Sequence, residues 1–305
     1  MNVNLSVKIG KLKLKNPVMV ASGTFGYAEE FKDFINLREL GAIVTKTITL
    51  NPRRGNLPPR TCETPAGMLN SIGLENPGVE VFLRDKLPFL NKLGIPVIIS
   101  IASEEDSGEF IELAKRISKL NSVSALELNI SCPNVAGQKT LISQDPKATY
   151  QIVRSIRKVT SKTLITKLSP NVSCIGEIAQ AAEAAGSDAV SLINTLSGMS
   201  VAIESRRPKL GAITGGLSGP AVRPVALKMV WEVYNKIKIP IVGMGGIIDT
   251  PSALEFFIAG ASAVSIGTAN FINPKTSVEV ISGLKAYLYH NKIKGIEELT
   301  GSLKI

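Results

Sequence analysis

Eight short apolar segments, separated by helical patterns, constrain the fold of this chain most strongly. The segments are rich in β-branched residues, as expected of strands buried on both faces of a parallel sheet. They span residues 16–22, 41–48, 95–102, 124–130, 163–168, 188–194, 239–245 and 263–269. Helical patterns cover residues 29–40, 108–120, 146–159, 175–186, 223–237, 251–260 and 277–290. This alternation predicts an α/β fold, a (β/α)8 TIM barrel.

Two additions to the barrel are expected. Alternating residues 3–15 around Gly10 predict an N-terminal β-hairpin. Residues 50–90 form an irregular insertion after the second strand, and its end, 78–90, has a helical pattern. A doubly wound sheet would need a GxGxxG turn after an early strand, and the sequence has none. No linker divides the chain, so we expect residues 1–305 to form one domain.

Histidine and cysteine are too sparse for the commonest catalytic and metal sites. The only histidine is His290, and the three cysteines, Cys62, Cys132 and Cys174, lie far apart with no CxxC pair. This spacing argues against a disulfide framework and against a metal site built by this chain alone. Any acid–base chemistry must therefore use other groups.

Charge and hydropathy limit the partners of the chain. The formal net charge is +10, but the basic residues are scattered and aromatic residues make up only 5% of the chain. This pattern predicts a solvated basic surface rather than a nucleic-acid site. No apolar run is long enough to span a bilayer, and the N-terminus has no signal-peptide pattern. We expect a cytoplasmic protein that contacts neither nucleic acid nor membrane.

Polar side chains stand where several predicted strands end. Lys46, Asn129 and Lys167 end the second, fourth and fifth strands, and Asn194 and Thr195 end the sixth. In a barrel of this kind, the active site is built at the carboxyl ends of the strands. Buried polar groups are costly unless they are paired. The arrangement therefore indicates a pocket for a polar ligand.

Glycine-rich turns follow the last two predicted strands. GMGGI (243–247) and SIGTAN (265–270) each precede a helical segment. Backbone N–H groups in such turns commonly hold a phosphate in this barrel type. With two lysines nearby and no metal site, the turns indicate a phosphorylated organic cofactor, and FMN fits because a lysine stabilises the reduced anionic ring.

The ordered motifs resemble one family. ASGTFG, TKT, MLNSIGLENPG, NISCPN, INT, GGLSGPAVRPVAL, GMGGI and SIGTAN together resemble the class 1 dihydroorotate dehydrogenases over nearly the whole chain. The NSIGLENPGVEVFL and GPAVRPVALKMV segments look more like the 1B type, the catalytic subunit of the NAD-dependent enzyme. The resemblance implies oxidation of (S)-dihydroorotate to orotate in pyrimidine (UMP) synthesis, with hydride transfer to FMN.

The resemblance also assigns residues, carried over from the matched motifs. The implied substrate-binding residues are Lys46, Asn70, Ser71, Ile72, Gly73, Leu74, Asn129, Asn134, Asn194 and Thr195. The implied flavin-binding residues are Ala21, Ser22, Lys46, Thr47, Asn129, Lys167, Ile193, Gly219, Gly245, Gly246, Gly267 and Thr268. One position departs from the family: Ser100 stands where a flavin-contacting asparagine is usual, and we expect its hydroxyl to reach the flavin through water.

Cys132, in NISCPN (129–134), is the catalytic base that the resemblance implies. Dehydrogenation removes a proton from C5 and a hydride from C6, and the base must face the side of the substrate opposite the flavin. A free thiol has a pKa of about 8.5, so a thiolate is accessible near neutral pH. The polar residues 135–145 that follow predict a mobile lid over the substrate.

The electron acceptor and several rival functions remain open on the sequence. A 1B subunit is expected to form a homodimer core that binds an electron-transfer subunit carrying FAD and a [2Fe–2S] cluster, giving a heterotetramer. A 1A-like enzyme would instead be a homodimer that reduces fumarate. The rivals are a flavin-dependent dihydropyrimidine dehydrogenase, a tRNA-dihydrouridine synthase, which would need a further RNA-binding domain, and a non-catalytic barrel.

Overall fold

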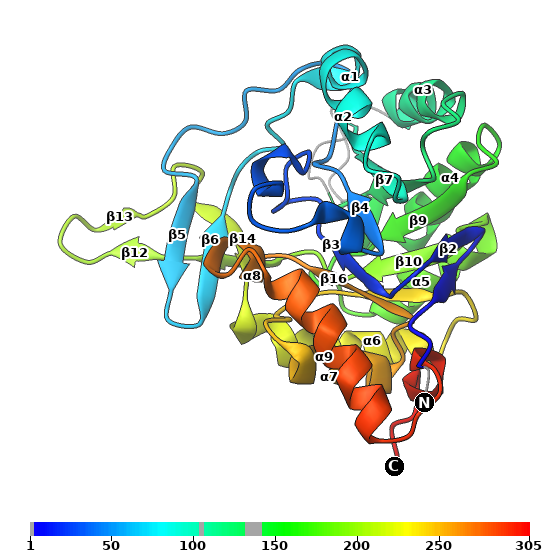
Figure 1. The fold of residues 1–305 in the computed structure, drawn as a ribbon. Helices are drawn as coiled ribbons and strands as arrows, with labels where there is room; N and C mark the ends of the chain where they lie inside the picture. Colours follow the sequence, from blue (N-terminus) through cyan, green and yellow to red (C-terminus); the bar gives the residue numbers. More distant parts are fainter. Residues whose placement is uncertain (1–2, 104–106, 132–141) are drawn as a thin grey trace.

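The computed structural model describes residues 3–103, 107–131 and 142–305. Eight parallel strands close into a barrel (Figure 1), which confirms the predicted fold class, and each of the eight predicted segments contains one of them. The barrel strands are β3 (Val18–Val20), β4 (Ala42–Val44), β7 (Val97–Ile101), β8 (Ala125–Asn129), β9 (Thr163–Lys167), β10 (Ala189–Leu192), β15 (Ile241–Gly243) and β16 (Ala263–Ile266).

Helices surround the barrel and begin and end where the sequence supplies suitable caps. The longer ones are α3 (Ser107–Ser118), α4 (Pro146–Arg157), α5 (Ile175–Ala185), α6 (Arg223–Tyr234), α7 (Thr250–Ala259) and α9 (Thr276–His290), with the short α8 (Ala269–Ile272) before α9. The Asp145 side chain accepts hydrogen bonds from the first turn of α4, and Asp249 does the same for α7. No helix among residues 3–103, 107–131 and 142–305 has the length and apolar character needed to cross a membrane.

The buried core has two parts. One lies between the strands and the surrounding helices, and the other fills the barrel interior. The N-terminal hairpin, β1 (Val7–Ile9) and β2 (Leu12–Leu14), is confirmed, and its Ile9, Leu12 and Leu14 belong to the interior part. Lys11 N–H donates to Thr163 Oγ1 at 3.1 Å, which places the hairpin at the amino end of β9. The hairpin therefore closes the amino end of the barrel and leaves the carboxyl end open.

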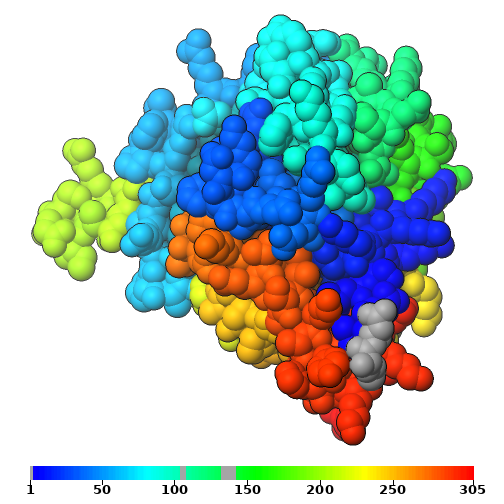
Figure 2. Space-filling model, in the orientation of Figure 1, coloured from blue at the N-terminus to red at the C-terminus, as the bar shows by residue number. Residues whose placement is uncertain are grey.

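A second sheet stands beside the open end. It has four antiparallel strands in the order β11-β14-β6-β5. These are β5 (Thr61–Thr64), β6 (Gly67–Asn70), β11 (Leu196–Met199) and β14 (Thr214–Ser218). A two-stranded extension, β12 (Val201–Ala202) and β13 (Arg207–Pro208), projects from the body of the molecule (Figures 1 and 2). The insertion ends in helical turns as predicted: α1 (Gly78–Val81), the π-helical η3 (Phe82–Lys86) and α2 (Leu87–Asn91).

One predicted helix, at residues 29–40, is wrong. The segment forms two 3-10 turns instead, η1 (Glu29–Phe31) and η2 (Leu37–Glu39). Asn36 is extended and its side chain accepts from the Arg38 N–H, so the backbone turns locally instead of continuing as a helix. Three further 3-10 turns are η4 (Ile142–Gln144), η5 (Pro220–Val222) and η6 (Ile296–Leu299).

Candidate functional site

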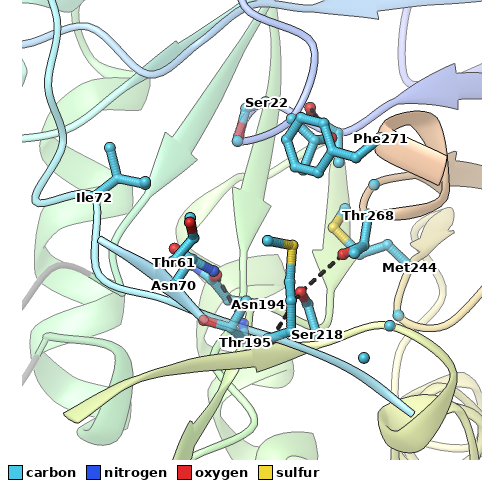
Figure 3. Close-up of a pocket in the computed structure, with 18 of the residues that line it drawn as sticks. Ser22, Thr61, Asn70, Ile72, Asn194, Thr195, Ser218, Met244, Thr268 and Phe271 are labelled. Carbon is cyan, nitrogen blue, oxygen red and sulfur yellow. Dashed lines mark hydrogen bonds between the residues drawn. The ribbon is translucent and has the colours of Figure 1, made fainter. Parts of the chain in front are cut away.

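A pocket of about 890 Å³ opens at the carboxyl ends of the barrel strands (Figure 3). Its floor is formed by the ends of the barrel strands, and one wall is formed by β5, β6 and the end of β14. In Figure 3, Asn70, Asn194, Thr195 and Ser218 line one side, and Phe271 and Ser22 lie across the cavity. The pocket thus combines segments that are far apart in the sequence.

The pocket brings together almost all the residues that the sequence assigned to substrate and cofactor. Those that line it are Ala21, Ser22, Lys46, Thr47, Asn70, Ser71, Ile72, Gly73, Leu74, Asn129, Lys167, Ile193, Asn194, Thr195, Gly219, Gly245, Gly246, Gly267 and Thr268. Cys132 and Asn134, together with residues 135–141 of the expected lid, lie outside the described residues.

Ser100 does not line the pocket. It lies in β7 with no exposed surface, and its hydroxyl is 2.9 Å from Thr47 Oγ1 and 3.1 Å from Glu127 Oε1. The side chain therefore faces the barrel interior below Thr47. The expected contact with the flavin through water stays a prediction, and the Ser100 hydroxyl lies against Thr47, which does line the pocket.

Two lysines give the pocket a positive charge. Lys167 is 6% exposed and its Nζ donates to Ser22 Oγ at 3.3 Å. Burial lowers the pKa of Lys46, and the nearby positive charge of Lys167 lowers it further, while Glu75 opposes the shift. An anion in the pocket would relieve this repulsion, so the pocket is suited to a negatively charged ligand.

Amide side chains form a connected row across the floor. Asn194 Nδ2 donates to Asn129 Oδ1 at 3.3 Å, and Asn129 Nδ2 donates to Thr47 Oγ1 at 3.4 Å. At the end of β6, Asn70 Nδ2 donates to the carbonyl of Gly216 at 3.3 Å. Each amide keeps further donors and acceptors, which can bind a flat, polar heterocycle.

Two glycine turns make a cradle for an anion. Gly246 has φ 78°, and a Cβ atom there would lie 2.9 Å from the Gly219 carbonyl oxygen, so only glycine fits without strain. Among the hydrogen bonds between described residues, none uses the N–H of Gly245, Gly246, Gly267 or Thr268. These donors line the pocket and are available to a phosphate.

Three buried hydroxyls in the pocket lining also lack partners. Ser71, Ser131 and Ser265 each have a buried Oγ with no hydrogen bond among the described residues. Buried polar groups are nearly always satisfied in folded proteins. Their presence here indicates that a bound polar ligand completes the site.

The sequence did not identify several lining residues. One of them is Ser218, whose Oγ accepts a hydrogen bond at 2.8 Å from Oγ1 of Thr268, a residue that the sequence did assign (Figure 3). Met244 and Phe271 add apolar surface. Ser218 directly precedes Gly219, and Met244 directly precedes Gly245. Because both glycines were assigned to the flavin site, their position in the sequence could have indicated these two residues. Phe271 had no such signal, because an aromatic residue after a strand-end turn is equally typical of core packing.

Comparison with known proteins identifies close relatives. The family model described as dihydroorotate dehydrogenase matches residues 4–288. A dihydroorotate dehydrogenase B (NAD(+)), catalytic subunit, of Thermoanaerobacter pseudethanolicus is 51% identical over 303 residues, covering 99% of this chain and all of the relative. Proteins with the same description from Caldicellulosiruptor bescii and Geotalea uraniireducens are 51% and 49% identical over 303 and 300 residues. They cover 99% and 98% of this chain, and 100% and 98% of the respective relatives.

Proposed function

The chain belongs to the dihydroorotate dehydrogenase family, and from this premise we propose that it oxidises (S)-dihydroorotate to orotate in pyrimidine synthesis, with FMN as its cofactor. The observation that carries the proposal is the pocket itself. It combines two lysines with backbone donors at glycine turns and three hydroxyls that have no hydrogen-bond partner within residues 3–103, 107–131 and 142–305. This donor set fits a phosphorylated, ring-containing cofactor and a carboxylate substrate.

The residues that would hold FMN form two groups, one at its phosphate and one at its ring. The turns at Gly245–Gly246 and Gly267–Thr268 would hold its phosphate, and Lys167, with Ser22 beside it, would face the ring. Bound FMN supplies the chemistry that the side chains lack, which is to accept a hydride from C6 of the substrate. Lys167 is buried and would supply a positive charge beside the ring.

Substrate binding and proton removal fall to other residues. Lys46 and the segment Asn70–Leu74 would hold the carboxylate of dihydroorotate, and the amides of Asn129 and Asn194 would hold its ring. Cys132 would take the C5 proton. Asn134 would add a further amide to the substrate. With these roles, a sequence that contains one histidine could still carry out acid–base chemistry.

A partner subunit would receive the electrons. The relatives are described as catalytic subunits of an NAD-dependent enzyme. We infer that this chain forms a homodimer core that binds a subunit carrying FAD and a [2Fe–2S] cluster. Native purification should then yield an iron-containing flavoprotein complex that reduces NAD with dihydroorotate. A homodimer without iron that reduces fumarate would contradict the NAD-linked assignment and favour the 1A-like one.

The proposed activity is directly visible in the flavin spectrum. The purified protein should be yellow, and anaerobic addition of dihydroorotate should bleach the flavin absorbance. Dihydrouracil is the matched control, since it has the same ring without the carboxylate that Lys46 and Asn70–Leu74 would bind. Equal bleaching by both compounds would favour a dihydropyrimidine dehydrogenase, and a colourless protein that binds no flavin would contradict the proposal.

The lowered pKa of Lys46 predicts how orotate binding depends on pH. A bound carboxylate stabilises the charged amine, so the pKa of Lys46 is higher in the complex than in the free protein. Between these two values, binding takes up a proton, and affinity should fall by up to about tenfold for each pH unit. The fall begins at a lower pH than it would for an ordinary lysine, because the free-protein pKa lies below its usual value.

Calorimetric titration of orotate between pH 7 and pH 10 measures this effect. Lys46→Met is the control, since it removes the titrating amine and leaves Lys167 in place. The difference between the two profiles isolates Lys46 from any titration of the ligand. Parallel profiles would show that Lys46 does not contact the carboxylate.

A further inference from the structure

A buried carboxylate lies directly beneath the pocket. Glu127, in β8, is 2% exposed and stands two residues before Asn129, so both side chains point into the barrel. Its two oxygens accept hydrogen bonds from Ser100 Oγ and Ser191 Oγ, each at 3.1 Å. Within the described part of the chain, no lysine or arginine forms an ion pair with it. A carboxylate buried in this way is costly, and core packing alone does not explain it.

The carboxylate determines the direction of the hydrogen bonds above it. The Ser100 hydroxyl is the donor to Glu127 Oε1, and this bond uses its single proton. Ser100 Oγ can then only accept from the Thr47 hydroxyl, 2.9 Å away. Because the Thr47 hydroxyl donates its proton to Ser100, Thr47 Oγ1 can only accept a hydrogen bond from the pocket side.

The same direction continues into the floor of the pocket. Thr47 Oγ1 accepts from Asn129 Nδ2 at 3.4 Å, so the Asn129 amide must present its oxygen on the other side. That oxygen accepts from Asn194 Nδ2 at 3.3 Å, and Asn194 Oδ1 in turn accepts from the Thr195 N–H at 2.8 Å. The chain from Glu127 to Thr195 therefore has one consistent polarity.

We propose that Glu127 is a positioning residue that fixes, through Ser100 and Thr47, which face of the Asn129 and Asn194 amides donates and which accepts in the pocket. The ligand therefore meets a preset pattern of donors and acceptors rather than amides that can flip. Ser100 is the link in this relay, which gives a function to the residue that departs from the family pattern. The identity of the ligand rests on the proposed function. The direction of the hydrogen bonds from Glu127 through Ser100 and Thr47 to the two amides does not.

Ser191 offers a matched control within the same cluster. Ser100 and Ser191 are 0% and 1% exposed, and both donate to Glu127 over the same distance, but only Ser100 leads to the pocket. Ser100→Ala and Ser191→Ala should therefore lower the melting temperature similarly. Only Ser100→Ala should release the amide of Asn129.

The first measurement needs no ligand. In protein labelled with ¹⁵N-asparagine, the side-chain amide resonances of Asn129 should shift or broaden in Ser100→Ala and stay in place in Ser191→Ala. Unchanged Asn129 resonances in Ser100→Ala, or equal changes in both variants, would overturn the proposal. The measurement is made on protein without bound cofactor, so its result does not depend on whether the protein is a dihydroorotate dehydrogenase.

The second measurement is FMN binding to the apoprotein, followed by quenching of flavin fluorescence. Ser100→Ala should weaken binding by about tenfold, as expected for a misaligned buried hydrogen-bonding group, and Ser191→Ala by less than about threefold. Thr47→Val keeps the size of the side chain but removes its hydroxyl, so it should weaken binding as much as Ser100→Ala does. Wild-type affinity in Thr47→Val would refute the relay, and wild-type protein that binds no FMN would refute the proposed function instead.

Discussion

Cys132→Ala is expected to slow dihydroorotate oxidation by about 10²–10⁴-fold while FMN stays bound, which is the usual contribution of a general base. The reason is chemical: a thiol loses its proton near neutral pH, and the single histidine of the sequence, His290, lies at the end of α9. Stopped-flow measurement of flavin reduction tests this directly, because it excludes the later electron-transfer steps. Reduction at the wild-type rate would reject Cys132 as the base.

The other two cysteines provide the controls. Cys62, in β5, and Cys174, before α5, are free, and neither lines the pocket. Alanine at either position should leave flavin reduction within about twofold of wild type, as for most substitutions away from a site. Cys132→Ser adds a second check, since a hydroxyl is a much weaker acid than a thiol. Its residual activity should rise with pH over a range where the wild type has levelled off.

The barrel could be predicted from the sequence because its signal is local and repeated. Each barrel strand is a short β-branched segment buried on both faces, such as Val97–Ile101 and Thr163–Lys167. The glycines and aspartates that end or begin the helices, such as Gly186 after α5 and Asp249 before α7, are equally local.

The sheet beside the pocket could not be predicted in the same way. β14 reads Thr-Gly-Gly-Leu-Ser, and it pairs with β6, whose residues lie about 150 positions earlier. Glycine has low strand propensity, and this pairing depends on where the closed barrel places the two loops. The helix predicted at residues 29–40 was wrong for a local reason. The apolar spacing of the segment is helical, but the Asn36 side chain accepts a hydrogen bond from the backbone and interrupts the helix.

Most of the pocket could be predicted because the carboxyl ends of parallel strands meet at one place. Lys46, Asn129 and Lys167 are recognisable as polar groups that end apolar runs. The sequence did not indicate Glu127, the residue that we propose fixes the direction of the hydrogen bonds leading to the pocket. A single glutamate inside ALELN looks like the outward face of a strand. Only the period of two, counted back from Asn129, places it inside the barrel.

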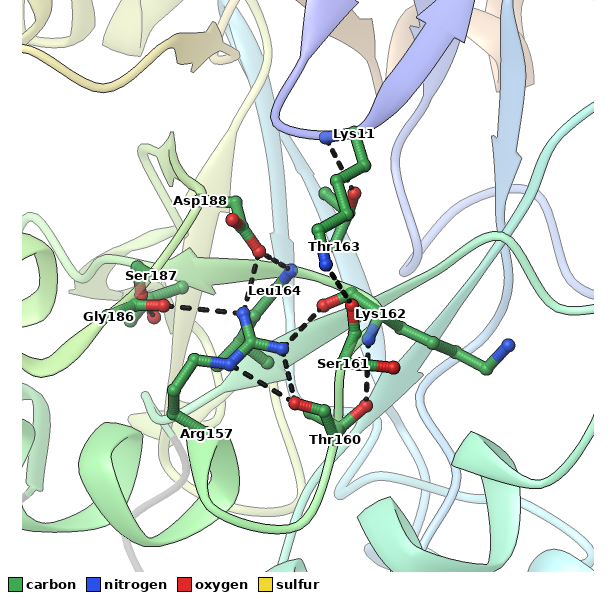
Figure 4. Close-up of polar contacts among 11 residues, drawn as sticks. Lys11, Arg157, Thr160, Ser161, Lys162, Thr163, Leu164, Gly186, Ser187 and Asp188 are labelled. Atoms are coloured by element: carbon green, nitrogen blue, oxygen red, sulfur yellow. Dashed lines mark hydrogen bonds and ion pairs between the residues drawn. The ribbon is translucent and has the colours of Figure 1, made fainter.

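At the opposite end of the barrel, Arg157 holds together the starts of two strands (Figure 4). Its Nη1 donates to Asp188 Oδ2 at 2.8 Å and also contacts the carbonyl of Gly186 at 3.4 Å. Its Nη2 donates to the carbonyls of Thr160 and Lys162 at 2.6 and 2.7 Å. The guanidinium thus joins the end of α4 to the loops that lead into β9 and β10.

Arg157→Ala is expected to lower the free energy of unfolding by about 3 kcal/mol, since it leaves a partly buried carboxylate and several carbonyls without their donor. For a chain of this size, that corresponds to a fall of roughly 5 °C in melting temperature. Thermal and urea unfolding measure the change. The kcat of the remaining folded enzyme at 20 °C should equal that of wild type, because Arg157 lies at the amino ends of the strands and the pocket at their carboxyl ends.

Two variants separate the hydrogen-bonding geometry from the charge. Arg157→Lys keeps the attraction to Asp188 but cannot reach the carbonyls at once, because an ammonium lacks the planar fork. It should therefore recover less than half of the lost stability. Arg154→Ala removes an exposed arginine one turn earlier on α4 and should change stability by less than about 0.5 kcal/mol. Full recovery by lysine would mean that charge alone holds this end together, and a matching fall in kcat would mean that the two ends of the barrel are coupled.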